Sequence, residues 1–271
     1  STNAITPSAF TILSNGNIGI GTSSPISKLA INGGNVIHVA SGTPTLVSTL
    51  DTSGSALGVF VRDRYAYIGD STAPNGLKII DVSSPSTPTL IGTYASNGTS
   101  YDVKVVGKYA YVPSDFYTIK IIDISNPSKP VRTGTAYTAG SYTVDLDISG
   151  KYMYLANKEA GLQIFDVSTS SPALVSTTGT ENGPYSVYVY GRYAYVVNNS
   201  SNTLQIFDIS NPSSPVAVSS VTTGVSSDPA SVYVSGRYAY VVGPNSISIF
   251  DVSNPSSPVF VGSATTGTAP Q

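Results

Sequence analysis

Four acidic residues, Asp102, Asp145, Glu159 and Glu181, are the candidates for acid–base chemistry in this chain of 271 residues. A glycosidase needs only two carboxyl groups at a suitable separation, one as the acid and the other as the base or nucleophile. All four residues fall in polar segments between apolar runs, and this loop placement is the only feature that distinguishes them. A glycan-active enzyme is therefore a lesser alternative for this chain.

Other catalytic chemistry lacks the residues that it requires. The chain has one histidine, His38, and no cysteine, so neither a thiol nucleophile nor a cysteine zinc site is available. Neither HExxH nor GxSxG occurs, and the glycine-rich stretch near Gly19 lacks the Lys-Ser/Thr pair and the following helix of a phosphate loop. We expect no enzyme activity, no metal site and no cofactor.

The composition favours an exported protein that binds neither nucleic acid nor membranes. Charged residues make up 10% of the chain, against roughly 25% in an ordinary soluble domain. The formal net charge is -2, which gives no electrostatic attraction for nucleic acid or anionic lipid. No apolar run approaches the roughly 20 residues of a membrane helix. Since Ser, Thr, Asn and Gly dominate the polar residues, we expect an extracellular or cell-surface location.

The elements that position these loops are internal repeats. Five copies of one string read DRYAYIGD, GKYAYVPS, GKYMYLAN, GRYAYVVN and GRYAYVVG. A second string, such as LQIFDISNPSSP, follows each copy, and its aspartates recur at spacings of 42, 43, 42 and 43 residues. These aspartates are Asp81, Asp123, Asp166, Asp208 and Asp251. A fixed period in this range is typical of a solenoid, a propeller or a domain array.

Each repeat contains four short runs of β type, which in the fourth copy are SVYVYG, RYAYVV, LQIFDI and PVAVSS. No stretch shows a helical period. Four strands in about 43 residues is the size of a propeller blade. The sequence therefore predicts an all-β protein, a β-propeller of four-stranded blades.

The recurring residues have structural explanations. Gly before Arg or Lys suits a tight hairpin that needs a positive φ. The Asn and Pro residues of SNPSSP favour a turn, which we expect the preceding Asp to stabilise. The alternation of Tyr-Ala-Tyr-Val predicts large rings in one gap between blades and small side chains in the next.

These strings resemble the LVIVD repeat family, whose consensus contains a Tyr-Val-Tyr-like strand followed by an IIDVSNPSNP-like strand and turn. The resemblance extends from Ala56 to about Ala264 in five copies. It implies a β-propeller of bacterial or archaeal surface or secreted proteins, and it implies no catalytic motif.

The first 50 residues have two interpretations. TPTLVSTL (Thr43–Leu50) matches TPTLIGTY (Thr87–Tyr94), so a fourth strand precedes the first clear copy. VIHVAS (Val36–Ser41) would then be a third strand, and Ser8–Gly21 the first two. This reading favours six blades, with residues 1–50 as a degenerate first blade and residues 51–271 as five regular ones.

The alternative is five blades and a separate N-terminal β segment. NGNIGIGTSSPISKLAING (Asn15–Gly33) resembles segments of phage tail-fibre and adhesin-like proteins. On this reading residues 1–50 are an assembly segment, and the surplus strand Thr43–Leu50 pairs with a neighbouring chain by strand addition.

The loops that vary between repeats are expected on one face of the propeller, named here the variable face. Loops between strands two and three, and between strand four and the next blade, differ in every copy, whereas the other two loop types are almost constant. Variation confined to one face is typical of a fixed scaffold with a grafted binding surface. The candidate binding residues are Asp70, Tyr101, Asp102, Asp115, Phe116, Tyr117, Tyr142, Asp145, Lys158, Glu159, Glu181, Asn182, Tyr185, Asn198, Asn199 and Asp228.

The leading hypothesis is a non-enzymatic surface propeller that serves in binding or adhesion through its variable face. Carboxylates, amides and aromatic rings together suit a glycan or a surface protein as partner. The alternative is a structural subunit of a surface layer, fibre or filament, assembled through the N-terminal segment.

Overall fold

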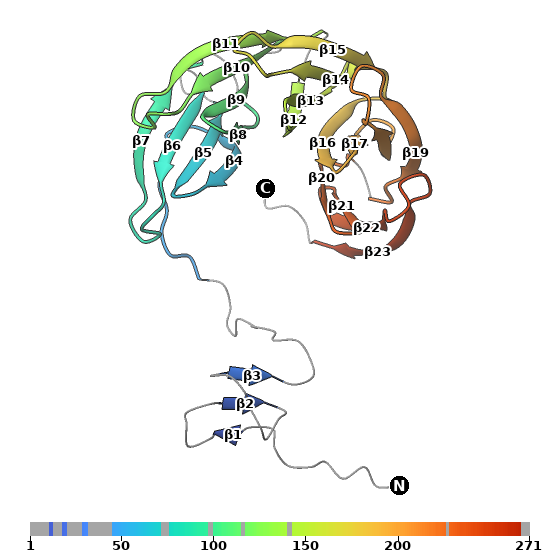
Figure 1. Cartoon of the computed structure of the whole chain (residues 1–271), viewed down its shortest axis with the longest axis horizontal. Coiled ribbons are helices and arrows are strands. Elements are labelled where there is room, and N and C mark those ends of the chain that lie inside the picture. Colours follow the sequence, from blue (N-terminus) through green and yellow to red (C-terminus); the bar gives the residue numbers. More distant parts are fainter. Residues whose placement is uncertain are drawn as a thin grey trace. The chain divides into compact units, whose positions relative to one another are not determined.

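A computed structural model describes residues 11–12, 18–20, 29–31, 45–71, 76–96, 100–114, 117–139, 143–225 and 228–266. The chain divides into two compact units, Ser1–Leu46 and Val47–Gln271. All the described elements are strands (Figure 1). No helix in the described ranges is long and apolar enough to cross a membrane.

The first unit contains one three-stranded sheet in the order β1-β2-β3. Strands β1 (Thr11–Ile12) and β2 (Ile18–Ile20) are antiparallel, but β3 (Leu29–Ile31) pairs with β2 in parallel. A propeller blade is antiparallel throughout, so this sheet is not a blade. The expected third strand Val36–Ser41, with His38, lies outside the described residues.

The second unit consists of five sheets of four strands, each antiparallel and consecutive in the chain. Blade 1 contains β4 (Ala56–Arg62), β5 (Tyr65–Asp70), β6 (Leu77–Asp81) and β7 (Thr89–Tyr94). Blade 2 contains β8 (Lys104–Val106), β9 (Tyr109–Ser114), β10 (Thr118–Asp123) and β11 (Val131–Tyr137). Blade 3 contains β12 (Thr143–Ser149), β13 (Tyr152–Asn157), β14 (Gly161–Asp166) and β15 (Ala173–Thr178). Blade 4 contains β16 (Pro184–Tyr190), β17 (Tyr193–Asn198), β18 (Thr203–Asp208) and β19 (Val216–Thr222). Blade 5 contains β20 (Ser231–Ser235), β21 (Tyr238–Val242), β22 (Ser246–Asp251) and β23 (Val259–Thr265).

The prediction of six blades is wrong, and the alternative of five is confirmed. The described part of the surplus segment, residues 45–50, forms no strand. Its similarity to an outer strand is a local property, and among the described residues of the first unit β1, β2 and β3 do not form the three antiparallel strands that would complete a blade.

The core lies between successive blades. Tyr195 and Leu204 of blade 4 pack against Val234 and Phe250 of blade 5, whereas Ala194 of the same strand β17 packs toward blade 3. The prediction for Tyr-Ala-Tyr-Val is therefore confirmed. Four clusters of this kind join the five blades in sequence order.

The first hairpin of every blade carries the same set of contacts, named here the hairpin clasp. In blade 3 the turn residue Gly150 has φ +59°, and Lys151 lies 5.0 Å from the ring centroid of Tyr152. The Nζ atom of Lys151 is 2.9 Å from Oδ2 of Asp166, whose Oδ1 accepts a hydrogen bond from the backbone N–H of Ser168. The expected turn role of the repeated aspartates is confirmed, and the ion pair is an addition to it.

Candidate functional site

The innermost strands of the five blades surround a cavity of about 790 Å³, which we call the channel. Each innermost strand starts on the variable side and ends at the hairpin of its clasp, where the residue of positive φ is Asp63 in blade 1 and glycine in the other four blades. The start of these strands therefore forms the mouth of the channel on the variable face.

Alignment on the hairpins arranges the channel residues in two layers. The layer nearer the variable face takes one residue from each blade in chain order, namely Gly58, Asp102, Asp145, Ser186 and Ser231. The layer two residues further along each strand is Phe60, Lys104, Asp147, Tyr188 and Tyr233. Both layers carry charged residues in blades 2 and 3 and uncharged ones in the other blades, so charge concentrates on one side of the channel.

Asp102 and Asp145 form a carboxyl pair at the mouth. Burial and, second to it, the negative charge of Asp145 raise the pKa of Asp102 to about 7. Oδ2 of Asp145 accepts hydrogen bonds from Ser186 Oγ at 2.7 Å and from the N–H of Val187 at 3.0 Å. Oδ2 of Asp145 therefore serves as an acceptor, and Asp102 is the carboxyl of the pair that holds a proton below about pH 7.

Asp147 lies deeper in the channel and ties blade 3 to blade 4. Its Oδ2 accepts a hydrogen bond of 2.8 Å from the backbone N–H of Val189. Burial raises the pKa of this carboxyl, against the influence of that hydrogen bond and of the nearby Lys104. The same channel layer brings Tyr188 and Tyr233 together edge to face, with ring centroids 5.0 Å apart.

Two smaller hollows adjoin the mouth. A hollow of about 200 Å³ is lined by Tyr101, Val144, Lys158 and Tyr185, and three of these residues also line the channel. A second hollow of about 360 Å³ shares Lys158 and runs between residues 158–161 and 179–184. The three spaces are therefore neighbours that share lining residues, and we call them together the depression.

The structure brings half of the predicted binding residues to this depression. They are Tyr101, Asp102, Asp145, Lys158, Glu159, Glu181, Asn182 and Tyr185. Tyr117 and Asp228 are exposed but line none of the three hollows. Asp115, Phe116 and Tyr142 lie outside the described residues.

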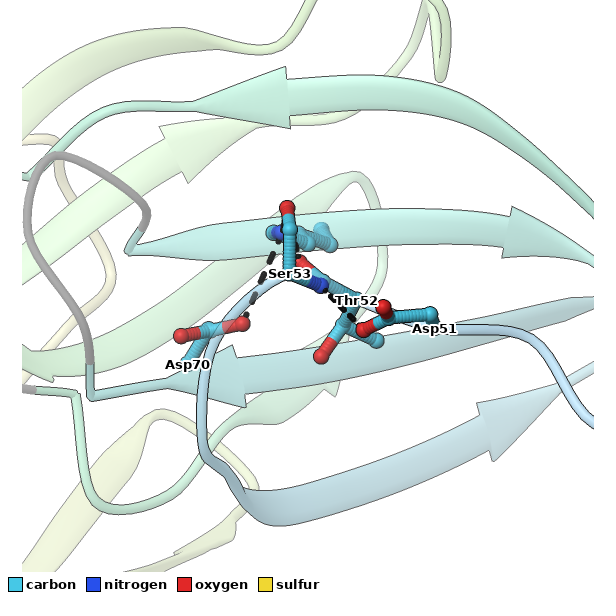
Figure 2. A network of polar contacts seen from close by, with 5 residues as sticks. Asp51, Thr52, Ser53 and Asp70 are labelled. Carbon is cyan, nitrogen blue, oxygen red and sulfur yellow. Dashed lines mark hydrogen bonds and ion pairs between the residues drawn. The ribbon is translucent and has the colours of Figure 1, made fainter.

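Three other predicted residues make internal contacts. Asp70 is fully buried, with its Oδ2 3.6 Å from Nζ of the equally buried Lys78. Figure 2 shows it beside the turn Asp51–Ser53, where the N–H of Ser53 donates to Asp51 at 2.7 Å. Asn198 is buried against Thr203 and Gln205, and the side chain of Asn199 donates to the carbonyl of Pro229 at 3.4 Å. These contacts hold loops in place, and none of the three side chains lines the depression.

Sequence reasoning missed four residues that line the channel, Lys104, Asp147, Tyr188 and Tyr233. They belong to strands rather than loops, so the search for variable loops passed over them. An alignment of the innermost strands could have found them. The position of the second channel layer holds Phe, Lys, Asp, Tyr and Tyr in successive blades, whereas the residues before and after it are always Val, Leu or Ile.

The carboxylates of the channel do not form a metal centre. In the described ranges, no group of three or more His, Asp or Glu side chains is arranged to hold a metal ion. Instead, Oδ2 of Asp145 and Oδ2 of Asp147 accept hydrogen bonds from the backbone N–H groups of Val187 and Val189 in blade 4.

Solved structures share the fold at low sequence identity. A protein of unknown function from Desulfotomaculum acetoxidans is 16% identical with a TM-score of 0.66, over 80% of this chain and 72% of the other. A candidate 6-phosphogluconolactonase from Bacteroides uniformis is 15% identical with a TM-score of 0.70, over 79% and 73%. A periplasmic gluconolactonase from Pseudomonas aeruginosa is 16% identical with a TM-score of 0.65, over 76% and 68%.

Comparison with curated proteins gives no match. The model of the LVIVD repeat matches residues 53–96, 97–138, 140–180, 185–223 and 228–266. Each of these segments contains one blade. This chain belongs to the LVIVD repeat family.

Proposed function

We propose that this protein is a surface or secreted recognition module that binds a sugar-like, polyhydroxylated ligand at the mouth of its channel. The observation that carries the proposal is the depression, in which the channel and two adjacent hollows share lining residues. Pockets of this kind, with a few convergent polar groups, are the usual location of small-ligand sites.

The polar groups of the depression include both hydrogen-bond donors and hydrogen-bond acceptors. Protonated Asp102 donates, Asp145 accepts, and the ammonium group of Lys158 donates. A ligand with many hydroxyl groups satisfies both kinds of partner, because each hydroxyl is donor and acceptor at once.

Two aromatic rings complete the match to a sugar. Tyr101 and Tyr185 both line the 200 Å³ hollow beside Lys158, and both are partly buried. An aromatic ring offers an apolar face beside a polar hydroxyl, which suits the C–H faces and hydroxyl edges of a pyranose. A surface protein bearing such a glycan is the partner that this site fits, and adhesion is the role that follows.

A glycan array followed by titration calorimetry tests the proposal. Tyr185→Ala and Lys158→Ala should each weaken binding of the selected glycan about tenfold or more. Tyr117→Ala is the matched control, because Tyr117 is an exposed tyrosine of the variable side that lines none of the hollows. Equal affinity in all four proteins, or no binding on the array, would overturn the proposal.

A second candidate function is hydrolysis of a sugar lactone or glycoside. The pairing of a protonated Asp102 with Asp145 favours it, since this is the arrangement of an acid with an acceptor. Two fold relatives named as gluconolactonases add weak support at 15% and 16% identity. Incubation with sugar lactones and aryl glycosides, with Asp102→Asn and Asp145→Asn as controls, decides between binding and turnover.

A further inference from the structure

The two end blades expose the apolar faces that every other blade buries. Val59 and Val61 of β4 are 64% and 61% exposed, whereas the equivalent Val103 and Val105 of blade 2 are 0% and 3% exposed. Figure 1 shows the five blades following one another around an arc, with blades 1 and 5 at its ends. The face of blade 1 that has no preceding blade is therefore open.

The outward face of blade 5 shows the same difference. Tyr195, Val197 and Leu204 of blade 4 are buried against blade 5. The equivalent residues of blade 5, Tyr240, Val242 and Ile247, are partly or largely exposed. We call the region between these two faces the seam.

At the outer edge of two blade interfaces, a serine hydroxyl donates a hydrogen bond to one backbone carbonyl. Ser176 Oγ donates to the carbonyl of Pro212 at 2.7 Å, and Ser219 Oγ donates to that of Pro255 at 2.6 Å. In both cases the outer strand of one blade contacts the SNPSSP turn of the next.

Glycine takes the serine position in blades 1 and 2. A Cβ added to Gly92 would lie 2.0 Å from the carbonyl oxygen of Pro127, so the backbones touch there. At Gly262, the corresponding residue of blade 5, an added Cβ meets nothing within 4 Å. The outer strand of blade 5 therefore has no SNPSSP-type turn against it, although it carries the glycine that contacts such a turn in blade 1.

At blade 1, a residue that precedes the blade in the chain makes the contact that an outer strand makes elsewhere. Ser48 Oγ donates to the carbonyl of Pro85 at 2.6 Å, and Pro85 belongs to the turn of blade 1. Ser48 aligns with Gly92 in the match of TPTLVSTL to TPTLIGTY. Ser48 thus takes the place of an outer-strand residue, although no strand among the described residues pairs with residues 45–50, and Leu46 and Val47 remain exposed.

We propose that the seam binds a three-stranded antiparallel β-sheet of a partner polypeptide, and that residues 45–50 add to this sheet as its fourth strand. The partner carries the strand pattern of the repeat, with Ala and Val on one face and Tyr, Leu and Ile on the other. Its two faces then reproduce interfaces that this chain already forms four times.

The contact at Pro85 selects three strands rather than four. A complete blade, such as blade 5 of a second copy, would bring its own outer strand onto the carbonyl that Ser48 already occupies. A sheet without an outer strand meets no such conflict and leaves an edge for strand addition. The apolar residues at both faces exclude a charged partner surface.

The probe for this proposal is a polypeptide of residues 228–258, which supplies β20 to β22 without β23. We expect the full chain to bind it in fluorescence anisotropy with protection of residues 45–62 and 238–251 in hydrogen exchange. Val59→Asp and Val47→Pro should weaken binding at least tenfold. Val216→Asp, at an exposed valine of the outer strand β19, is the matched control.

A second format guards against poor solubility of the probe. The same residues are joined by a flexible linker after Gln271 of the full chain, and Tm is compared with and without Val59→Asp. A rise in Tm that Val59→Asp abolishes supports the proposal. Absence of binding in the first format together with an unchanged Tm in the second overturns it. The proposal is also overturned if the amides of Val59 and Val61 are protected from hydrogen exchange in the free chain, because blade 1 would then be covered by blade 5 or by another copy.

Discussion

The aspartates of the hairpin clasps and those of the channel have opposite electrostatic surroundings. Hydrogen bonds from Ser168 and Lys151 lower the pKa of Asp166 to about 2, and Arg192 does the same for Asp208. Burial and a neighbouring carboxylate instead raise the pKa of Asp102 to about 7. The aspartates of the clasps therefore stabilise the fold in their ionised form, whereas the surroundings of Asp102 in the channel favour the neutral acid.

Asp208→Asn tests the clasp. Because the folded pKa of about 2 lies below the unfolded value near 3.9, the stabilisation is complete above pH 4 to 5 and is lost as the pH falls toward 2. We expect the variant to melt at a lower temperature than the natural chain at pH 7 and at nearly the same temperature at pH 2. Calorimetric melts at several pH values check this, and parallel curves down to pH 2 would contradict it.

Asp102→Asn tests the channel in the opposite direction. A folded pKa raised to about 7 means that stability is greatest below the unfolded pKa and declines as the pH rises through 7. One pKa unit corresponds to about 1.4 kcal/mol, so we expect the natural chain to lose a few kcal/mol between pH 4 and 8 through this group. The asparagine variant should show a flatter profile of Tm against pH and should be the more stable protein at pH 8.

The strands divide into a buried inner set and an exposed outer one. Phe207 of the third strand of blade 4 is fully buried between blades 3 and 4, whereas Phe260 of the outer strand of blade 5 is 52% exposed. The outer strands contribute mainly through backbone pairing and the carbonyl contact at each turn. The side chains of the three inner strands hold the blades together.

Two phenylalanine truncations measure this division. Phe207→Ala should lower the free energy of unfolding by about 3–5 kcal/mol, because it leaves a cavity between two blades. Phe260→Ala should cost about 1 kcal/mol, since water already reaches the ring and only its contact with Phe250 is lost. Urea unfolding of both variants makes the comparison, and similar losses would show that the outer strand is part of the core.

The sequence was sufficient to predict the blades because their determinants are local. The hairpin glycines and the Asn side chains of the SNPSSP turns act within one repeat, and the Tyr-Ala-Tyr alternation can be recognised within one strand although its side chains pack against neighbouring blades. The number of blades depends instead on whether three strands accompany Thr43–Leu50, which a single matching strand cannot reveal. In the site, eight of the sixteen predicted residues line the three hollows, but the direction of each side chain was not predictable. Asp70 turns inward to Lys78, while Lys158 lines a hollow.

At the scale of the whole molecule, the second unit is a row of blades in which each contacts its neighbours in sequence. Stability in such arrays is nearly a sum of the units and of the interfaces between them. Blades 2, 3 and 4 have two buried faces each, whereas blades 1 and 5 expose one face at the seam.

Hydrogen exchange of the free chain should therefore be graded along the row. We expect the amides of β13 and β14 in blade 3 to exchange most slowly and those of β5 and β22 in the end blades to exchange faster, because opening an end blade breaks one interface instead of two. Mass spectrometry of peptides from each blade checks the order. Uniform protection across all five blades would indicate that the unit opens as a whole.

The hairpin clasp has a consequence for how such proteins change length. All of its contacts lie within one blade: the cation, the ring, the aspartate and the turn that the aspartate supports. A gene segment that encodes one blade therefore carries its own folding signal wherever recombination inserts it, provided that its two faces keep the repeat pattern. Duplication or loss of a whole repeat then leaves the folding of the other blades intact, and the loops of the variable face can change in sequence without affecting the clasps.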